Sequence, residues 1–358
     1  MRVLLLATGA FGGHGGIALY NRDFLTALCT HPGCTEVIAI PRLMPAEPGP
    51  LPAKLTYVTS GLGGKFRYIC AVLRLLFVDR HFDLIVCGHL NLLPLAFLAK
   101  VLSRAPLLLA IYGIEAWKPS PSRLVRRLVR RVDAYFSISD VTRRRFLEWA
   151  APRETEGHLL PNAIHLERYT PGPKSPELLR RHGLTGKAVL LTVGRLAGEE
   201  RYKGVDEVLE LMPDLPREIS YLVVGDGNDR QRLTDKANAL GLADRVIFAG
   251  YVPEGEKADH FRIADVFVMP SRGEGFGFVF LEAMACGVPV IGSTLDGSRE
   301  ALRDGLLGTL VDPGNRAELL AAVHQALAST ERSVPEGLSH FSFARFESRL
   351  HELVSRIA

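Results

Sequence analysis

The sequence predicts an α/β protein with two doubly wound, Rossmann-like domains. Short β-rich, apolar segments alternate with helical stretches from end to end, and near-continuous apolar strands are typical of parallel sheets covered on both faces. A turn-rich segment at residues 160–176 interrupts this alternation. With 358 residues, 47% of them hydrophobic, the chain can bury two cores of ordinary size. We therefore expect one domain at residues 1–170 and a second at 171–338, with an amphipathic helix at about 339–358 that packs back on the first.

Twelve segments carry the apolar pattern expected of buried strands. In the first domain these are residues 3–8, 36–40, 55–58, 83–88, 106–113 and 134–139. In the second domain they are residues 188–194, 220–225, 246–250, 266–271, 289–293 and 308–312. Open parallel sheets bind ligands beyond the carboxyl ends of their strands. Two such domains facing each other would form a deep cleft, which is where we expect the site.

Composition and charge exclude several classes of protein. The apolar run at residues 2–8 is too short for a signal peptide core or a membrane span, so we expect a cytoplasmic protein. Five cysteines without a C-x-x-C pair support neither a zinc site nor a disulfide framework. No nucleic-acid-binding module occurs, so nucleic acid is not an expected partner.

Positive charge is concentrated in the first half. Residues 1–170 carry 21 Lys and Arg against 12 Asp and Glu, whereas residues 171–358 carry 22 against 27. Much of the excess lies at residues 122–133, which include Arg126, Arg127, Arg130 and Arg131, and at residues 65–80. One interpretation is that these are solvated helix faces. The other is attraction to an anionic membrane surface, where the protein would be peripheral, or to a phosphorylated acceptor.

The glycine-rich stretch "GAFGGHGGIA" (residues 9–18) follows the first strand and precedes a helix. Such a turn presents unpaired helix N–H groups to an anion. Gly13-x-Gly15-x-x-Ala18 also fits the dinucleotide fingerprint, but the second strand ends in Pro41-Arg42 instead of the acidic residue that binds the ribose of NAD. The loop is therefore a structural turn, a site for the phosphate of another ligand or, despite the missing acidic residue, a dinucleotide site.

The stretch "PSRGEGFGFVFLEAMACGVPVIGS" (residues 270–293) places Glu274 before a helix that contains Glu282. On one helix these carboxylates would lie about 12 Å apart along the axis, too far for a glycosidase pair. We expect them to contact different parts of one extended ligand; for Glu282, a structural ion pair is the alternative. In "VGRLAGEERYKG" (residues 193–204), Arg195 and Lys203 follow another strand and could clamp a diphosphate; for Arg195, a surface ion pair is the alternative.

Together with "VVGDGNDR" and "LPNAIHLERYTPG", these stretches resemble the retaining GT-B glycosyltransferases of glycosyltransferase family 4. The resemblance spans nearly the whole chain and is most specific at residues 188–315. It implies a nucleotide-diphosphate sugar donor and a glycan, lipid-linked or other hydroxyl acceptor, in bacterial cell-surface or exopolysaccharide biosynthesis. It also implies that the phosphate at the glycine-rich loop is that of the donor.

The resemblance also assigns roles to residues. Arg195 and Lys203 would bind the diphosphate, Glu274 the donor sugar and Glu282 the ribose. Donor-binding positions would further include those of the glycine-rich loop, the base loop "GYVPEGEK" and the helix start. These are Gly15, Gly16, Tyr251, Val252, Phe276, Gly277, Phe278 and Val279.

One position departs from the family pattern. Many relatives carry a His where "IYGIEAW" has Tyr112, and His14 or His89 could take its place as an acceptor or sugar contact. No Asp-x-Asp motif occurs, so we expect no metal and no resident cofactor. A non-hydrolysing sugar-nucleotide epimerase of the same fold and an NAD-dependent oxidoreductase are the alternative functions.

Overall fold

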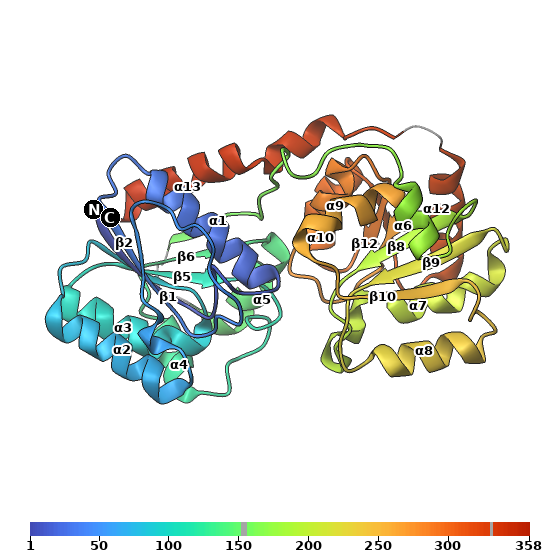
Figure 1. The fold of residues 1–358 in the computed structure, drawn as a ribbon. Helices are drawn as coiled ribbons and strands as arrows, with labels where there is room; N and C mark the ends of the chain where they lie inside the picture. The colour runs from blue at the N-terminus through green and yellow to red at the C-terminus, as the bar shows by residue number, and fades with distance from the viewer. Residues whose placement is uncertain (152–155, 330–331) are drawn as a thin grey trace. The chain divides into compact units, whose positions relative to one another are not determined.

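The computed structural model describes residues 1–151, 156–329 and 332–358 as two compact units. Unit 1 comprises Met1–Ala163 and Phe343–Ala358, and unit 2 comprises Ile164–Ser342 (Figure 1). The boundary at Ala163 and Ile164 lies inside the turn-rich segment at residues 160–176. No helix in the described part of the chain combines the length and apolar character needed to cross a membrane.

Unit 1 is built on a seven-stranded parallel sheet with the order β3-β2-β1-β4-β5-β6-β7. Its strands are β1 (Arg2–Ala7), β2 (Glu36–Pro41), β3 (Leu55–Tyr57), β4 (Leu84–Cys87), β5 (Leu107–Ile111), β6 (Ala134–Ser137) and β7 (Glu156–Leu159). The first six were predicted from the apolar pattern and are confirmed. The polar segment that forms β7 was missed, because it pairs at the sheet edge and lacks a buried run.

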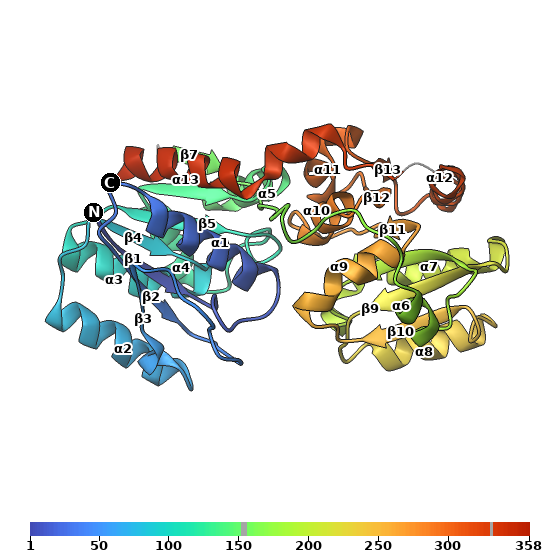
Figure 2. The same cartoon turned by 45° about the horizontal axis from the view of Figure 1, so that its top comes forward.

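Helices cover both faces of this sheet (Figure 2). On one side, α2 (Lys65–Val78), α3 (Leu93–Ser103), α4 (Arg123–Val129) and α5 (Asp140–Ala150) supply buried residues to a common core. On the other side, α1 (Gly16–Thr30) packs against α13 (Phe343–Ile357). Helix α13 buries Phe346, Leu350, Leu353 and Val354, the spacing of a single amphipathic stripe. The Phe346 ring contacts Tyr20 of α1 edge to face.

Unit 2 is built on a six-stranded parallel sheet with the order β10-β9-β8-β11-β12-β13. Its strands are β8 (Ala188–Val193), β9 (Ile219–Val224), β10 (Val246–Gly250), β11 (Val266–Val268), β12 (Val290–Ser293) and β13 (Thr309–Val311), all of them predicted. Its helices are α6 (Pro176–Arg181), α7 (Val205–Leu211), α8 (Arg230–Ala239), α9 (Glu254–Ile263), α10 (Phe278–Ala285), α11 (Ser298–Ala301) and α12 (Arg316–Ala328).

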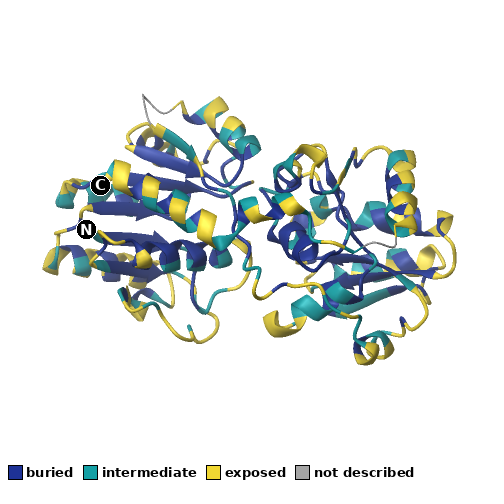
Figure 3. Ribbon diagram, turned by 90° about the horizontal axis from the view of Figure 1, so that it is seen from above, coloured by how far each residue is buried: buried dark blue, intermediate teal, exposed yellow. Residues whose placement is uncertain are grey.

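The strands of both units are largely buried, as Figure 3 shows. Strand order reverses once in each sheet, between β1 and β4 in unit 1 and between β8 and β11 in unit 2. Loops diverge at such a switch point, so the space beyond the carboxyl ends of the two strands is the ordinary ligand site of a doubly wound sheet. The fold thereby marks one candidate position in each unit.

Candidate active site

The switch point of unit 2 collects the residues that the sequence assigned to the diphosphate and the sugar. Arg195 follows β8, and the 3₁₀ segment η3 (Gly198–Lys203) carries Lys203 beyond the same strand. Glu274 follows β11, in the turn that leads into α10. Since β8 and β11 are adjacent in the sheet, these segments emerge side by side at one edge.

Lys203 and Glu274 form a direct ion pair. The Lys203 Nζ donates to Glu274 Oε1 at 2.7 Å, and each side chain is only 15% exposed. Burial by itself acts to lower the pKa of Lys203, but attraction to Glu274 outweighs it and the pKa is raised. Lys203 is therefore a fixed positive charge at neutral pH, held within reach of a carboxylate.

Arg195 and Glu200 complete this charged cluster. Arg195 forms an ion pair with Glu200, whose other oxygen lies 3.6 Å from Lys203 Nζ. Glu200 is buried, whereas the Arg195 side chain is 70% exposed, so a ligand can reach it. Two cations and two carboxylates thus balance one another. Glu200 was not singled out from the sequence, although its spacing of three residues from Lys203 is compatible with an ion pair on one helical turn.

The start of α10 lies next to this cluster in the chain. Gly277 precedes the helix with φ 90° and has no side chain with which to cap the helix start. A Cβ at Gly277 would lie 2.6 Å from the Phe280 ring, which explains the need for glycine here. The N–H groups of the first helical turn have no intrahelical acceptor, so Phe278 and Val279 can present theirs to an anion. Phe276 is buried and packs on Phe341.

Asp296 holds the turn that carries Glu274, a role that the sequence did not reveal. Its carboxylate is fully buried and accepts hydrogen bonds from the Glu274 N–H at 2.8 Å and from the Ser271 hydroxyl at 2.7 Å. Gly297 passes so close that a Cβ there would lie 2.1 Å from the Gly275 carbonyl oxygen. The sequence signal that could have pointed to Asp296 is its position just after β12, at the same edge of the sheet as Glu274.

Glu282 lies in α10 and is 1% exposed. Its Oε1 accepts from Lys257 Nζ at 2.8 Å and from the Tyr169 hydroxyl at 3.1 Å. Burial raises the pKa of Glu282, while Lys257 acts in the opposite direction. Among the described residues its Oε2 has no hydrogen-bond partner, which leaves one acceptor atom for a hydroxyl group.

The Glu282 contact also links two predicted parts of the nucleoside site. The predicted base loop at residues 250–257 is a loop only at residues 251–253, because α9 begins at Glu254. Lys257 lies in this helix, and its contact makes the segment and the predicted ribose carboxylate neighbours. Tyr251, in the same loop after β10, is largely exposed, and Val252 is partly so. Lys257 and Tyr169 were not assigned to the site from the sequence, because their contact with Glu282 depends on pairing distant segments.

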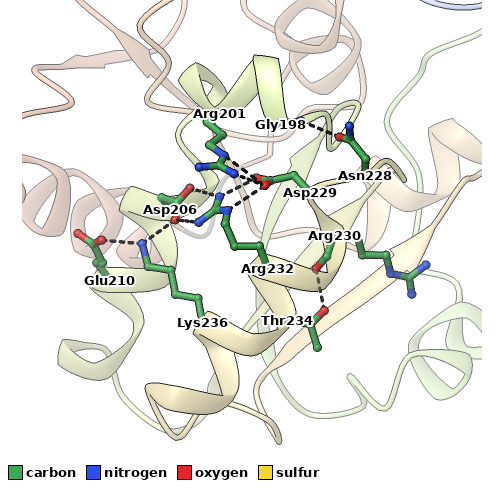
Figure 4. Close-up of polar contacts among 10 residues, drawn as sticks. All are labelled: Gly198, Arg201, Asp206, Glu210, Asn228, Asp229, Arg230, Arg232, Thr234 and Lys236. Carbon is green, nitrogen blue, oxygen red and sulfur yellow. Dashed lines mark hydrogen bonds and ion pairs between the residues drawn. The ribbon is translucent and has the colours of Figure 1, made fainter.

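A polar network holds η3 against the loop after β9, as Figure 4 shows. The Arg232 guanidinium bonds both Asp206 at 2.7 Å and Asp229 at 2.6 Å, and Arg201 of η3 lies 3.0 Å from the same Asp229 carboxylate. The Asn228 Oδ1 accepts from the Gly198 N–H at 2.7 Å. The segment that carries Lys203 is thereby fixed to the body of unit 2.

The switch point of unit 1 carries the glycine-rich loop. Gly15 precedes α1 with φ 87° and has no side chain with which to cap this helix start, and His14, Gly15 and Gly16 are exposed. A Cβ at Gly12 would lie 2.2 Å from the Ala46 carbonyl oxygen, so the turn itself requires glycine. The backbone amides at the start of α1 are therefore accessible, as a phosphate-binding loop needs.

His89 and Tyr112 follow β4 and β5 of the same sheet. His89 is partly buried, and its Nδ1 accepts from the Asn91 N–H at 3.1 Å; burial lowers the pKa of His89. Tyr112 is buried, and its hydroxyl donates to Asn21 Oδ1 at 2.7 Å, while Asn21 donates to the Gly9 carbonyl at 2.8 Å. The Tyr112 hydroxyl thus supports the glycine-rich loop from within the core, and its contact with a sugar stays a prediction.

Two groups of predicted residues are brought together in unit 2, Arg195 and Lys203 with Glu274, and Glu282 with the base loop. The unit 1 residues His14, Gly15, Gly16, His89 and Tyr112 lie at the carboxyl edge of the other sheet. In the described parts of the chain, no group of three or more His, Cys, Asp or Glu side chains is placed to hold a metal ion. The groups in unit 2 that could hold an anion are the side chains of Arg195 and Lys203 and the amides at the start of α10.

Comparison with known proteins identifies relatives of both units. Residues 175–334 match the family "Glycosyl transferases group 1", and residues 12–163 match the "Glycosyl transferase 4-like domain". A GDP-mannose-dependent alpha-(1-6)-phosphatidylinositol monomannoside mannosyltransferase of Mycolicibacterium smegmatis is 32% identical over 73% of this chain and 74% of that protein. A D-inositol 3-phosphate glycosyltransferase of Geodermatophilus obscurus is 34% identical over 58% of this chain and 47% of its own length.

Solved structures share the architecture at lower sequence identity. Anabaena Alr3699/HepE, solved in complex with UDP and glucose, has a TM-score of 0.80 and 20% identity, with 99% of this chain and 100% of that chain covered. The lipopolysaccharide outer core galactosyltransferase WaaB has a TM-score of 0.73 and 18% identity, with 99% of each chain covered. At these identities the likeness establishes the fold alone.

Proposed function

Because the chain belongs to the glycosyl transferases group 1 family and has the GT-B fold of glycosyltransferase family 4, we propose that it is a retaining enzyme that transfers a hexosyl unit from a nucleotide-diphosphate sugar to a hydroxyl acceptor. Family membership makes it a glycosyltransferase and decides against the epimerase and oxidoreductase alternatives. The stereochemistry, the donor and the acceptor are the parts that we propose.

The observation that carries the proposal is the contact between Lys203 and Glu274 at the switch point of unit 2, next to the uncapped start of α10. Lys203, Arg195 and the amides of Phe278 and Val279 would bind the diphosphate. Negative charge grows on that group as the bond to the sugar breaks, and fixed positive groups stabilise it most at that point. Glu274 would accept hydrogen bonds from the sugar hydroxyls.

In the proposed step, the bond between the anomeric carbon and the phosphate oxygen breaks while the acceptor oxygen bonds to that carbon from the same face. The acceptor proton passes to a phosphate oxygen, and the nucleoside diphosphate leaves. This step needs no protein nucleophile, and cationic side chains replace a divalent metal in stabilising the departing charge.

For the donor we propose a GDP-hexose, and for the acceptor a lipid-linked, inositol-containing glycan at an anionic membrane surface. The support is the 32% identical relative, which is named as GDP-mannose-dependent and as acting on a phosphatidylinositol monomannoside. The structural neighbour in complex with UDP shares the fold at 20% identity, so it is compatible with a nucleotide-sugar donor in general and does not bear on the choice of base. This acceptor would place the enzyme in cell-surface glycoconjugate biosynthesis.

Ligand-induced thermal stabilisation tests the donor. A ligand present at one hundred times its Kd stabilises the folded state by about 2.7 kcal/mol. GDP should therefore raise the Tm more than UDP, ADP or NAD at equal concentration. Transfer from GDP-mannose to phosphatidylinositol mannoside, with the anomeric configuration of the product read by NMR, tests the reaction. An inverted product, or stabilisation by NAD alone, would contradict the proposal.

A further inference from the structure

A cluster of one phenol, one ammonium group and a second carboxylate surrounds the predicted ribose carboxylate, Glu282. The Tyr169 hydroxyl lies 3.1 Å from Glu282 Oε1 and 2.9 Å from Glu254 Oε1. Lys257 Nζ lies 2.8 Å from Glu282 Oε1 and 3.7 Å from Glu254 Oε1. Tyr169 and Glu282 are buried, whereas Glu254 is exposed. Glu282 is thus held by two donors, and each of them also contacts a second carboxylate.

Tyr169 has one hydroxyl hydrogen for two acceptors. Burial and the neighbouring carboxylates raise the pKa of Tyr169, so the hydroxyl keeps this hydrogen at neutral pH. Burial by itself acts to lower the pKa of Lys257, but attraction to Glu282 and Glu254 outweighs it and the pKa is raised. Both donors are therefore present at neutral pH, and the hold on Glu282 depends on how much of the Tyr169 hydrogen bond goes to Glu254.

The two donors on Oε1 decide where the other oxygen of Glu282 lies. Among the described residues, Oε2 is buried without a hydrogen-bond partner. A ligand hydroxyl that reaches it would remove an unfavourable, unsatisfied acceptor and form a hydrogen bond to a charged group. The terminal torsion of a glutamate side chain has no sharp preference of its own. Contacts from Tyr169 and Lys257 therefore fix the orientation in which Oε2 is presented.

Packing places the Tyr169 ring independently of its hydroxyl. The ring contacts Phe261 edge to face at 6.2 Å, and Lys257 Nζ lies 6.0 Å from the ring centroid. Phe261 and Lys257 both belong to α9, whereas Glu282 belongs to α10, which packs on α9. The ring is thus seated on one helix while the hydroxyl reaches the carboxylate of the next. Removing the hydroxyl should leave the ring in place.

We propose that Tyr169 is a positioning residue for the ribose of the donor. Its hydroxyl holds the Glu282 carboxylate in the orientation in which Oε2 accepts a ribose hydroxyl. Its contact with Glu254 ties that carboxylate to the start of α9, directly after residues 251–253 of the base loop. This inference rests on the proposed function, in which Glu282 binds the ribose.

Calorimetric titration of GDP and of dideoxy-GDP, which lacks both ribose hydroxyls, tests the inference. A hydrogen bond to a charged group is worth roughly 10- to 100-fold in affinity, so the parent protein should prefer GDP by about that factor. Tyr169→Phe should reduce this preference at least about fivefold by weakening GDP alone. A merely structural role would weaken both ligands alike. The corresponding UDP pair is measured in parallel, so that the result does not depend on the base.

Tyr221→Phe is the matched control. Tyr221 is buried in unit 2, and its hydroxyl donates to Thr192 Oγ1 at 2.7 Å. This variant also loses one buried hydroxyl from a packed ring, but at a distance in sequence and contact from the cluster around Glu282. It should leave the preference for GDP over dideoxy-GDP unchanged. The Tm of each variant without ligand shows that the protein is folded.

Glu254→Gln should act in the opposite direction to Tyr169→Phe. It removes the competing charge, so the Tyr169 hydrogen and Lys257 are left to Glu282, and the preference for GDP should stay or rise. A fall as large as that in Tyr169→Phe would overturn the inference, because the cluster would then act only as structural support.

The remaining outcomes separate this inference from the proposed function. A parent protein that prefers GDP, with the same preference in Tyr169→Phe, would overturn the role of Tyr169 and leave the proposed function intact. Equal binding of GDP and dideoxy-GDP by the parent protein would remove Glu282 from the ribose and overturn the inference as well. A parent protein that binds neither GDP nor UDP would overturn the proposed function together with the inference.

Discussion

A double-mutant cycle on Lys203 and Glu274 separates a diphosphate clamp from a merely structural ion pair. Lys203→Met keeps the length and apolar stem of the side chain, and Glu274→Gln keeps the shape of the carboxylate. Both singles and the double variant are compared for free energy of unfolding and for turnover. If the ion pair is merely structural, the double variant should recover both stability and turnover. If Lys203 clamps the diphosphate, the double variant should recover stability alone.

The structure sets the expected size of the stability effect. Unit charges 2.7 Å apart attract by about 6 kcal/mol at an effective dielectric of about 20. Desolvation of two largely buried groups offsets most of this attraction. We therefore expect a coupling free energy of about 1–3 kcal/mol, measured from urea midpoints at constant m-value. The double variant should be more stable than the sum of the single effects implies.

Turnover, unlike stability, should not recover in the double variant. If Lys203 meets the charge that develops on the leaving diphosphate, Lys203→Met lowers kcat by about 10²-fold or more, as Arg195→Ala should also do. The double variant would then stay at least as inactive as either single variant. Lys174→Met with Asp265→Asn is the control, because it removes an ion pair of 2.6 Å elsewhere in unit 2. Recovery of turnover together with stability in the double variant would refute the clamp.

Four further outcomes are expected. Activity should persist in excess EDTA, and a loss that Mn²⁺ or Mg²⁺ restores would contradict a metal-free mechanism. Tyr112→Phe should lower the free energy of unfolding by about 1–2 kcal/mol, because it leaves Asn21 Oδ1 buried without its donor; an unchanged stability with lost activity would instead place the hydroxyl at the sugar. Glu200→Gln should tighten GDP binding in calorimetry, because it removes a carboxylate that competes for two cations. Hydrogen bonding from Arg232 lowers the pKa of Asp206 to about 2 from its ordinary 3.8. Asp206→Asn should therefore destabilise the protein at pH 7, and its difference in stability from the parent protein should vanish as the pH falls through about 2. Acid titrations followed by circular dichroism measure this difference.

The architecture could be predicted from the sequence because its strands are buried on both faces. A continuous apolar run bounded by glycine marks such a strand without knowledge of its neighbours, as residues 188–194 do for β8. Strand β7 lacks such a run and was not predicted, because its pairing with β6 makes it a strand and its composition does not indicate one. Helix α13 was predictable because the spacing of its apolar residues is likewise a local pattern, which needs no knowledge of neighbouring segments.

The grouping of Arg195, Lys203 and Glu274 was predictable because each residue follows a strand of the same sheet, and their roles stay predictions. Contacts between distant segments were not predictable. Asp296 reaches Glu274 across 22 positions of sequence, and Tyr112 reaches Asn21 across 91. A single sequence does not show such pairs, although each of these side chains fixes a loop that the sequence had placed at the site.

The balance of charge at the switch point of unit 2 has a consequence for the proposed mechanism. Arg195 and Lys203 are already paired with Glu200 and Glu274, so net charge alone does not attract the donor. A diphosphate that draws Lys203 away would free the Glu274 carboxylate, whose turn Asp296 keeps in place. That carboxylate could then accept hydrogen bonds from the donor sugar, which lies next to the diphosphate in the same molecule. We therefore expect binding of the diphosphate to prepare the sugar contact, so that GDP-mannose should gain affinity over GDP in the parent protein and lose that gain in Glu274→Gln.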